Sequence, residues 1–475
     1  VLRLQVATLK QSVKRATVRI RGMEANDADV AGHLNTLAAY LLNNRMAASW
    51  RMHIERLAQW GLGDSPAVSL LHVYQDQKEV LRMQKFSLED FVLFVNQAMT
   101  IDAEEGMPEE LAMDVAGMIF DKDRETEFVD TINDIFPQLK AKTIRKSIKQ
   151  LREEGVAEFP VVEMECNEPR IEALRMWEDV FVPVTTQDPE DCRVVYVRRW
   201  MTLPQLEEKE RMEGWDSEAI DVLTGREKGS SPGKGGESYL LEAEDIGMYG
   251  VQRSEGTTSR EGEYEVITAY INGVNDDGVP GVFTVNFSGF VDTPLSDMTL
   301  LDYPHGGLPF VWYVREYVSK CLLDSRGVCE LLQTDQDFIK HMRDLSADHA
   351  QVFTLPPYLH NMMSPDQEIR FSSLSLVQVG PTGKLEPLPI PRTDDLPIRH
   401  IQSRLEEVSR YFGVPLVEID GLIQRLLTQD MVDDFMDTIR QALMMLMQLA
   451  VEYMDEAEIR AITGAGEEIT MEEMR

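Results

Sequence analysis

The chain has few cysteines and a deficit of positive charge. Its 475 residues include four cysteines, none of which lies in a CxxC pair. This usage argues against a disulfide framework and a thiolate zinc site, and it fits a reducing compartment. Forty-seven basic residues stand against eighty-two acidic ones, a formal net charge of −35. Such a surface repels phosphate, so we do not expect a protein that grips nucleic acid through clustered Lys and Arg.

Long apolar runs are also missing. The most apolar stretch, residues 442–451, contains Gln448 and is far shorter than the roughly 20 residues that a bilayer requires. We therefore expect no membrane span. The amino end carries basic residues throughout and no continuous apolar core, so it does not look like a secretory signal.

What is present is the composition of a folded protein. Apolar residues make up 43% of the chain and charged residues 27%, which is typical of globular domains. At about 150 residues per domain, the length allows roughly two to four units. A single small fold is not expected.

The first third of the chain predicts helices around a strand. Residues 29–60 show helical spacing and end in "WGLGDSP", whose glycines and proline stop a helix. Residues 67–76 have strand composition. Residues 87–149 are helical in composition, and Ser87 stands three residues before Asp90, close to a capping box.

The middle of the chain predicts strands and turns. Strand-like runs lead up to Trp200, and Thr202 stands three residues before Gln205 at a helix start. Residues 225–262 are rich in glycine, serine and charge and predict a loop that marks a boundary. "YEVITAYI" and "GVFTVNFSGFV", separated by Asn-Gly and Asp-Gly, are the strongest antiparallel signal.

The last third predicts long helices. Helical patterns cover residues 325–352, 398–412 and a final block from Met431, with short strands and turns over residues 358–397. A cluster of methionines in the final block favours a core or subunit contact over a pliable binding groove. Taken together, these elements predict an α+β protein.

Two groups of side chains could ligate a metal. "DPEDC" supplies Asp188, Glu190 and Asp191, but it lacks the glycine bend and the distal acid of a hard-cation loop, so a solvated turn is the competing interpretation. The second group shares helical spacing and could equally be the wet face of an amphipathic helix; it comprises His341, Asp344, Asp348 and His349.

Recognisable catalytic motifs are missing. "GSSPGKGG" is not a GxxxxGK[ST] loop, and neither GxSxG nor HExxH occurs. We assign no catalytic, cofactor-binding or metal-ligating residue and do not expect an enzyme. Arg145, Lys149 and Arg152, at i, i+4 and i+7, form either a positive stripe for contacts or an exposed face that balances the acids.

The order of these pieces resembles one family. "QWGLGDSPAVSLLHVYQD" is followed by "MWEDVFVPVTTQDPEDCRVVYVRRWMTLPQLEE", an antiparallel module, a helix with "LLQTDQDFIKHMRDLSADHAQVFTLPPYL", and "IQSRLEEVSRYFGVP". Over about residues 26–415 this resembles the portal (head-to-tail connector) proteins of tailed double-stranded DNA bacteriophages, most closely those of short-tailed phages. A module that recurs in this family consists of a strand, an Asp-Pro pair, strand residues with Arg-Arg, and a Met-Thr pair that opens a helix. In this chain the matching residues are Phe181, Asp188, Pro189, Arg198, Arg199, Met201 and Thr202.

The resemblance implies a portal-like fold with five regions. A helical wing would occupy residues 1–225, with a helical insertion at about 87–152, and a mixed α/β core would support it. Residues 226–324 would hold the first stem region and a small antiparallel clip near 264–314. Residues 325–357 would form the second stem helix and the tunnel loop, 358–420 the rest of the wing, and 421–475 a short helical crown.

The resemblance also implies a function without chemistry or cofactor. The chain would form a ring of about twelve subunits at one capsid vertex of the virion, assembled in the host cytoplasm. Double-stranded DNA would pass through its channel without sequence-specific contacts during packaging and ejection. Major capsid protein, scaffold, terminase and tail or adaptor proteins would dock on it, and no membrane is involved.

The candidate tunnel-loop segment is small and is defined by order alone. It comprises Thr354, Leu355, Pro356, Pro357, Tyr358, His360 and Asn361. Two other functions stay open from the residues. One is a metal nuclease or hydrolase that uses carboxylates such as Asp188, Asp191, Asp344 and Asp348. The other is a monomeric scaffold or adaptor without enzymatic activity.

Overall fold

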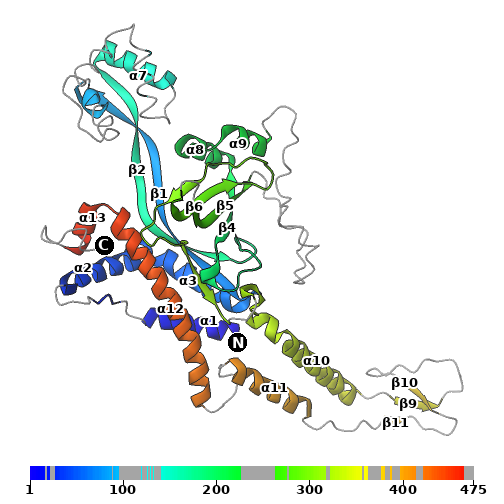
Figure 1. Cartoon of the computed structure of the whole chain (residues 1–475). Helices are drawn as coiled ribbons and strands as arrows, with labels where there is room; N and C mark the ends of the chain where they lie inside the picture. The colour runs from blue at the N-terminus through cyan, green and yellow to red at the C-terminus, as the bar shows by residue number, and fades with distance from the viewer. Residues whose placement is uncertain are drawn as a thin grey trace. The chain divides into compact units, whose positions relative to one another are not determined.

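The structure is a computed structural model of the chain. It describes residues 1–15, 19–21, 27–87, 89–95, 119, 126, 129, 132, 141–225, 263–274, 278–316, 321–355, 358–361, 376–379, 386–387, 396–412 and 421–464. Helices occur together with antiparallel sheets, so the expected α+β class is confirmed (Figure 1). The chain divides into two compact units. The first comprises Val1–Val73, Ile171–Cys192 and Pro309–Met447, and the second Tyr74–Arg170, Arg193–Leu308 and Gln448–Arg475.

The first unit opens with three α-helices. They are α1 (Leu2–Arg15), α2 (Asp27–Tyr40) and α3 (Ala47–Gly63), and a π-helical turn, Leu41–Arg45, separates the last two. The helical pattern predicted over residues 29–60 is therefore broken once. Trp50, Ile54 and Leu57 are buried on α3 at helical spacing, so this helix contributes one apolar face to the core.

Strand pairing in the first unit joins distant segments. β1 (Val68–Ser87) begins here and pairs antiparallel with β8 (Phe310–Val314), from Val68 opposite Val314 to His72 opposite Phe310. The clip expected near residues 264–314 included β8. β8 pairs with β1 rather than with the preceding hairpin, and the position of the clip stays a prediction.

Helix α12 (Gly421–Tyr453) packs on this sheet with one face. Phe435 lies edge-on to the ring of Tyr313, with ring centroids 4.9 Å apart. Thr438 Oγ1 donates to the backbone oxygen of Trp312 at 3.3 Å. Among its described side chains in the first unit, the buried residues of α12 recur at helical spacing, as the amphipathic pattern predicted: Phe435, Thr438, Ile439, Ala442, Leu443, Leu446 and Met447.

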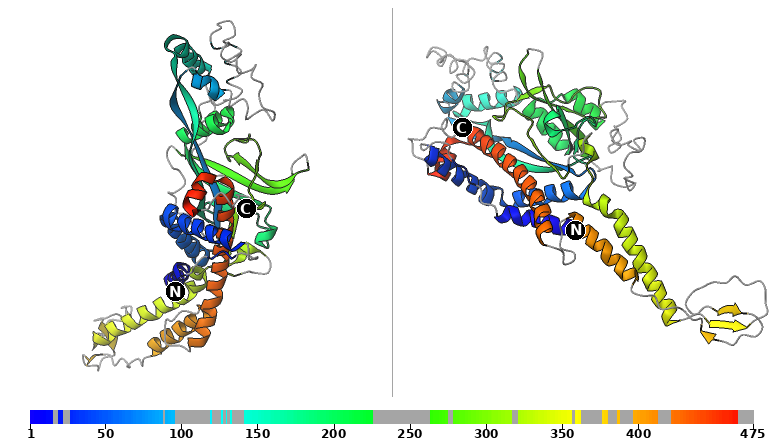
Figure 2. Two further views of the ribbon diagram at one scale, coloured as in Figure 1. Left: turned by 90° about the vertical axis from the view of Figure 1, so that its left-hand side faces the viewer. Right: turned by 60° about the horizontal axis from the view of Figure 1, so that its bottom comes forward.

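Two further helices of the first unit lie side by side (Figure 2). They are α10 (Val328–Thr354) and α11 (Leu396–Phe412), close to the predicted bounds. Their shared apolar cluster lies near the start of α10, where Val328 and Leu332 pack with Val408 and Phe412. A small sheet with strand order β10-β9-β11 is formed by Leu376–Val379, Tyr358–Asn361 and Glu386–Pro387.

The second unit contains a long two-stranded ribbon and a helical head (Figure 1). β1 and β2 (Val156–Arg175) are neighbours, and α7 (Ala141–Glu154) precedes β2. The buried residues of the head form one cluster: Phe86, Phe91, Val95, Ile119, Val129, Ile132, Ile144, Ile148, Leu151, Ala157 and Phe159. Residues 89–95 and α7 are helical as predicted, and much of the segment between them lies outside the described residues. Ser87 Oγ accepts from the Asp90 backbone nitrogen at 3.3 Å, which is the predicted cap.

The second unit also holds the strongest predicted hairpin. β5 (Glu263–Val274) and β6 (Pro280–Phe287) pair antiparallel. β4 (Val194–Thr202) pairs with β5, and β7 (Thr299–Leu301) pairs with β6. Helices α8 (Leu203–Glu213) and α9 (Ser217–Thr224) bury Leu206, Trp215 and Ile220 against Val266 and Leu295.

The remaining elements are short. They are β3 (Val180–Phe181), the 3₁₀ turns Pro189–Asp191 and Leu322–Asp324, and α13 (Glu456–Thr463). Among the helices of the described residues, none is both long and apolar enough to cross a membrane.

Thr202 and Gln205 cap the start of α8. Thr202 and Gln205 form a reciprocal capping box, in which the Thr202 backbone nitrogen donates to Gln205 Oε1 at 2.8 Å. Thr202→Ala removes the side-chain half and should lower the free energy of unfolding by about 1 kcal/mol. Thr202→Ser keeps the hydroxyl and should retain most of the stability. Urea denaturation followed by circular dichroism measures both, and equal losses in the two variants would contradict this role.

Candidate functional site

The end of α3 is the point on which four segments of the first unit converge. We call residues 61–66, "GLGDSP", the α3 turn. α3 ends at Gly63, Asp64 follows in extended conformation, and β1 begins at Val68. The turn therefore passes the chain from a helix directly to a buried strand.

Two glycines allow close packing at the α3 turn. A Cβ on Gly61 would lie 2.4 Å from Cδ1 of Tyr313 and 2.7 Å from Oγ of Ser69. A Cβ on Gly327, just before α10, would lie 2.0 Å from the backbone oxygen of Asp64. Any larger side chain at either position would force these segments apart. The glycines thus set how closely β8 and α10 approach the turn.

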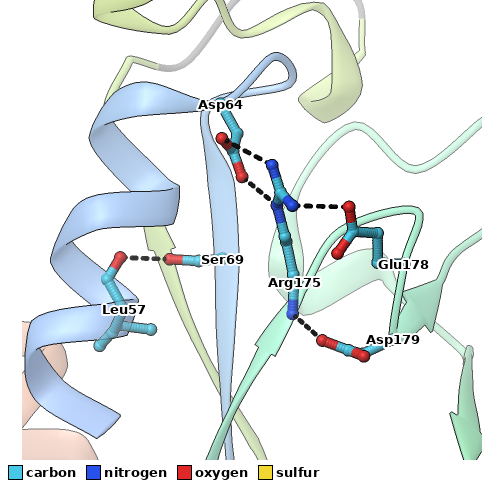
Figure 3. A network of polar contacts seen from close by, with 6 residues as sticks. All are labelled: Leu57, Asp64, Ser69, Arg175, Glu178 and Asp179. Atoms are coloured by element: carbon cyan, nitrogen blue, oxygen red, sulfur yellow. Dashed lines mark hydrogen bonds and ion pairs between the residues drawn. The ribbon is translucent and has the colours of Figure 1, made fainter. Parts of the chain in front are cut away.

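Arg175 ties the α3 turn to the end of β2 (Figure 3). Its Nε and Nη2 donate to the two carboxylate oxygens of Asp64 at 2.5 and 3.2 Å, and Nη1 donates to Glu178 Oε1 at 2.6 Å. Its backbone nitrogen donates to Asp179 Oδ2 at 3.0 Å. The hydrogen bond with Asp64, more than any other contact, raises the pKa of Arg175. A two-pronged arginine–carboxylate pair fixes orientation as well as distance.

The turn that follows Arg175 has an unusual backbone. Trp177 has a φ of 67°, and its nitrogen donates to the Val180 oxygen at 2.9 Å. A positive φ on a bulky residue is uncommon and persists only where surrounding contacts impose it. Here the contacts of Arg175 with Glu178 and Asp179 close the turn, and the Trp177 ring lies edge-on to Phe181.

The first turn of α10 is held by the same region. The Ala67 nitrogen donates to the Ser325 oxygen at 2.8 Å, and the Arg315 nitrogen donates to the Ala67 oxygen at 3.2 Å. Ser65 Oγ donates to a carboxylate oxygen of Glu330. α10 is therefore anchored at its amino end by backbone as well as side-chain contacts.

The rest of α10 is much more exposed than its start. Val328 and Leu332 are its buried residues, whereas Leu345 and Phe353 are 48% and 47% exposed. Large apolar side chains exposed along one helix are typical of a surface that contacts another protein. Five acidic and two basic residues also lie along α10, so the helix carries net negative charge.

The candidate tunnel segment lies where α10 ends. Thr354 is the last helical residue, and Leu355 caps the helix and is 46% exposed. Pro356 and Pro357 lie outside the described residues. Tyr358, His360 and Asn361 belong to β9, the central strand of the small sheet. The segment is thus a helix end followed by a strand, and its position in a channel stays a prediction.

The predicted basic stripe lies on α7 in the second unit. Arg145 and Lys149 are exposed, and Lys149 is 3.9 Å from Glu153. Arg152 is half-buried, and its Nε donates to the backbone oxygen of Ile119. Arg152 therefore has a structural contact within the head, whereas the other two face solvent.

The motif residues of the resemblance have separate structural tasks. Phe181 lies in β3, and the Asp188 side chain accepts from the Glu190 nitrogen to cap a 3₁₀ turn. Arg198 on β4 is buried and lies 3.6 Å from the buried carboxylate of Glu265 on β5. The Arg199 guanidinium lies over the Tyr74 ring, 5.7 Å from its centroid. The paired arginines thus act in sheet packing within the second unit.

The carboxylates considered as metal ligands lie on separate elements. Asp188, Glu190 and Asp191 surround the 3₁₀ turn, whereas His341, Asp344, Asp348 and His349 lie on α10. No group of three or more His, Cys, Asp or Glu suited to a metal ion occurs among the residues that the structure describes.

The sequence did not assign the residues of the α3 turn to a site. Gly61 was interpreted only as part of a helix stop, and Gly327 and Arg175 carried no recognised motif. The signal that could have pointed to them is the pair of glycines flanking a buried Leu62, since a helix stop needs only one glycine. Their partners Tyr313 and Asp64 lie too far away in sequence to be inferred.

Close packing at the α3 turn predicts opposite effects of one substitution at two glycines. Gly61→Ala should lower the free energy of unfolding by about 1–3 kcal/mol, because the new methyl group overlaps the Tyr313 ring. Gly32→Ala, inside α2 with open space around its Cβ, should raise it by about 0.5–1 kcal/mol. Thermal denaturation compares the two. Equal stabilisation by both would show that the turn can relax without loss.

His53 predicts a pH dependence of the first unit. Its Nδ1 accepts from the Ala173 nitrogen at 3.0 Å, and burial, followed by the charge of Arg56, lowers the pKa of His53. When the pH falls below 6.5, the usual pKa of histidine, His53 binds a proton more readily in the unfolded chain than in the folded chain. Stability should therefore fall as the pH drops from 7 through 6. His53→Gln should flatten this difference in melting curves measured between pH 7.5 and 5.5, and an unchanged slope would contradict it.

Comparison with known proteins adds no relative to this description. A scan against protein-family models finds no match, and a search of curated proteins finds none either.

Proposed function

We propose that this chain is the structural subunit of a portal ring at one capsid vertex of a tailed bacteriophage. The observation that carries the proposal is α10, a long helix anchored at its amino end on the α3 turn and exposing apolar side chains along its length. A helix held rigidly at one end can present the same surface to neighbouring copies, as ring closure requires. The choice of the portal family comes from the order of the sequence motifs.

The negative charge of the chain favours a channel through which DNA passes over a surface that binds DNA tightly. Its net charge is −35, and α10 itself carries five acids and two cations. Phosphate contacts made by clustered cations would hold DNA at each step, in a salt-dependent manner. An acidic lining would instead repel the duplex from all sides and centre it, while a separate motor drives it. DNA would then pass without sequence-specific binding.

The ring would have no catalytic activity of its own and no cofactor. Its partners would be the major capsid protein, scaffold, terminase and tail or adaptor proteins, and it would reside in the virion after assembly in the host cytoplasm. The wing, stem, clip and crown regions would follow the ranges given above, with α10 as the second stem helix and β5–β6 in the clip.

If the chain forms a ring, its mass in solution should be that of the assembly, and substitutions on the exposed face of α10 should weaken assembly. Light scattering of the purified chain should give about twelve times the subunit mass of 54.1 kDa, and negative-stain images should show annular particles. Leu345→Ser with Phe353→Ser should reduce the ring fraction about tenfold while the helical content is kept, because exposed apolar side chains dominate such contacts. Met83→Ser with Met164→Ser, equally exposed on the ribbon, should leave assembly unchanged.

Two outcomes would contradict the proposed function. One is a single-chain mass at every concentration, even with capsid partners present. The other is divalent-metal binding in calorimetry that is lost in Asp344→Asn with Asp348→Asn, because tight binding at these acids would favour the hydrolase.

A further inference from the structure

Four exposed cations lie in a row on α7. They occur at i, i+3, i+4 and i+7, the spacing that places side chains on one helix face, and we call them the basic row: Lys142, Arg145, Lys146 and Lys149. The opposite side of α7 is buried in the head through Ile144, Ile148 and Leu151. The head thus fixes which way the basic row faces, and it faces solvent.

Four exposed acids lie in a row on α12 with the same spacing. We call them the acidic row: Asp430, Asp433, Asp434 and Asp437. No basic residue occurs between the first and the last of them. Phe435, Thr438 and Ile439, on the other side of the helix, are buried, so the acidic row is also fixed in orientation.

The two rows match in length and pattern. Both have successive separations of three, one and three residues and span about 10 Å along their helix axes. The pattern reads the same in both directions, so the rows can pair with the helices parallel or antiparallel. Among the described helices, no other carries four like charges at this spacing.

Within the part of the chain that the structure describes, each row has one ion pair. Among the described residues, the ion pairs of the rows are Lys149 with Glu153 at 3.9 Å and Asp437 with Arg440 at 3.0 Å, both at row ends. Burial, followed by the charges of Asp430, Asp437 and Asp433, raises the pKa of Asp434. The acidic row therefore repels itself, and nearby cations would relieve that repulsion.

We propose that the basic row of α7 docks on the acidic row of α12 in a second copy of this chain. Complementary sign and identical spacing favour this occupant over a nucleic acid, since regular phosphates have no such pattern and the net charge of −35 opposes a long polyanion. At physiological ionic strength the screening length is about 8 Å, so the charges in contact outweigh the distant like charges of the two copies.

This contact is directional. Each copy offers its basic row to one neighbour and its acidic row to another, which is a head-to-tail interface that can close into a ring. The inference rests on the self-association that the proposed function requires, but not on ring closure or on DNA. Exposed charge pairs contribute mainly register, association rate and salt sensitivity. The two charged rows would therefore align the copies, while apolar surfaces would supply most of the binding energy.

Charge reversal tests the contact from both sides. Variant A carries Lys142→Glu and Lys146→Glu, and variant B carries Asp430→Lys and Asp434→Lys. Each should weaken self-association about tenfold in concentration-dependent light scattering, although their net charges change in opposite directions. A matched control, Arg399→Glu with Arg410→Glu on exposed positions of α11, changes the net charge as variant A does and should assemble normally. Circular dichroism checks that all are folded.

Mixing the variants separates contact between copies from contact within one chain. An equimolar mixture of A and B should recover assembly, because A offers its acidic row to the basic row of B, and the reversed rows also pair. A chain with all four substitutions should recover it alone. Recovery in the four-substitution chain but not in the mixture would place the contact within one chain and overturn the proposal.

Other outcomes distinguish the remaining possibilities. If the wild-type chain assembles and variants A and B assemble equally well, this contact is wrong and the ring proposal stands. A wild-type chain that never assembles would overturn both. If variant A alone fails to assemble and also loses retention of a DNA duplex that the wild type shows at low salt, the basic row binds phosphate and the proposed contact is wrong.

Discussion

Close packing against two glycines, Gly61 at the end of α3 and Gly327 before α10, is the constraint on which the first unit depends. Gly61 admits the Tyr313 ring, and Gly327 admits the oxygen of Asp64. Tyr313 in turn receives Phe435 of α12 edge-on. A helix end, two strands, the start of α10 and the middle of α12 are thus positioned by the absence of two side chains, in an interior where packing leaves little room for adjustment.

Polar contacts then fix the orientation that close packing allows. The pair formed by Arg175 and Asp64 is only partly buried, so solvent screening limits its contribution to stability. Its geometry matters more, because two parallel hydrogen bonds set the angle between the α3 turn and the strained turn at Trp177. In the second unit, Arg198 and Glu265 are both buried, and removal of either would leave an uncompensated charge.

Charge is unevenly distributed along the chain. The excess of acids is spread over the chain, yet α7 and α12 concentrate opposite charges in rows of the same spacing. Screening makes these effects compatible, since like charges beyond about 8 Å hardly interact at physiological salt. The self-association proposed for this chain would therefore need local basic surfaces, and α7 is the clearest of them among the described helices.

Local patterns determined the elements whose signals lie within a few residues. Thr202 and Gln205 predicted the start of α8, alternation around Asn-Gly and Asp-Gly predicted β5 and β6, and apolar spacing predicted α10, α11 and the face of α12. The tertiary structure alone decided that β8 pairs with β1, that Gly61 lies against Tyr313, and that Arg175 reaches Asp64. These contacts join residues more than 100 positions apart. Shape, burial and charge in the folded chain select such partners, so the residues next to each one in the sequence do not reveal them.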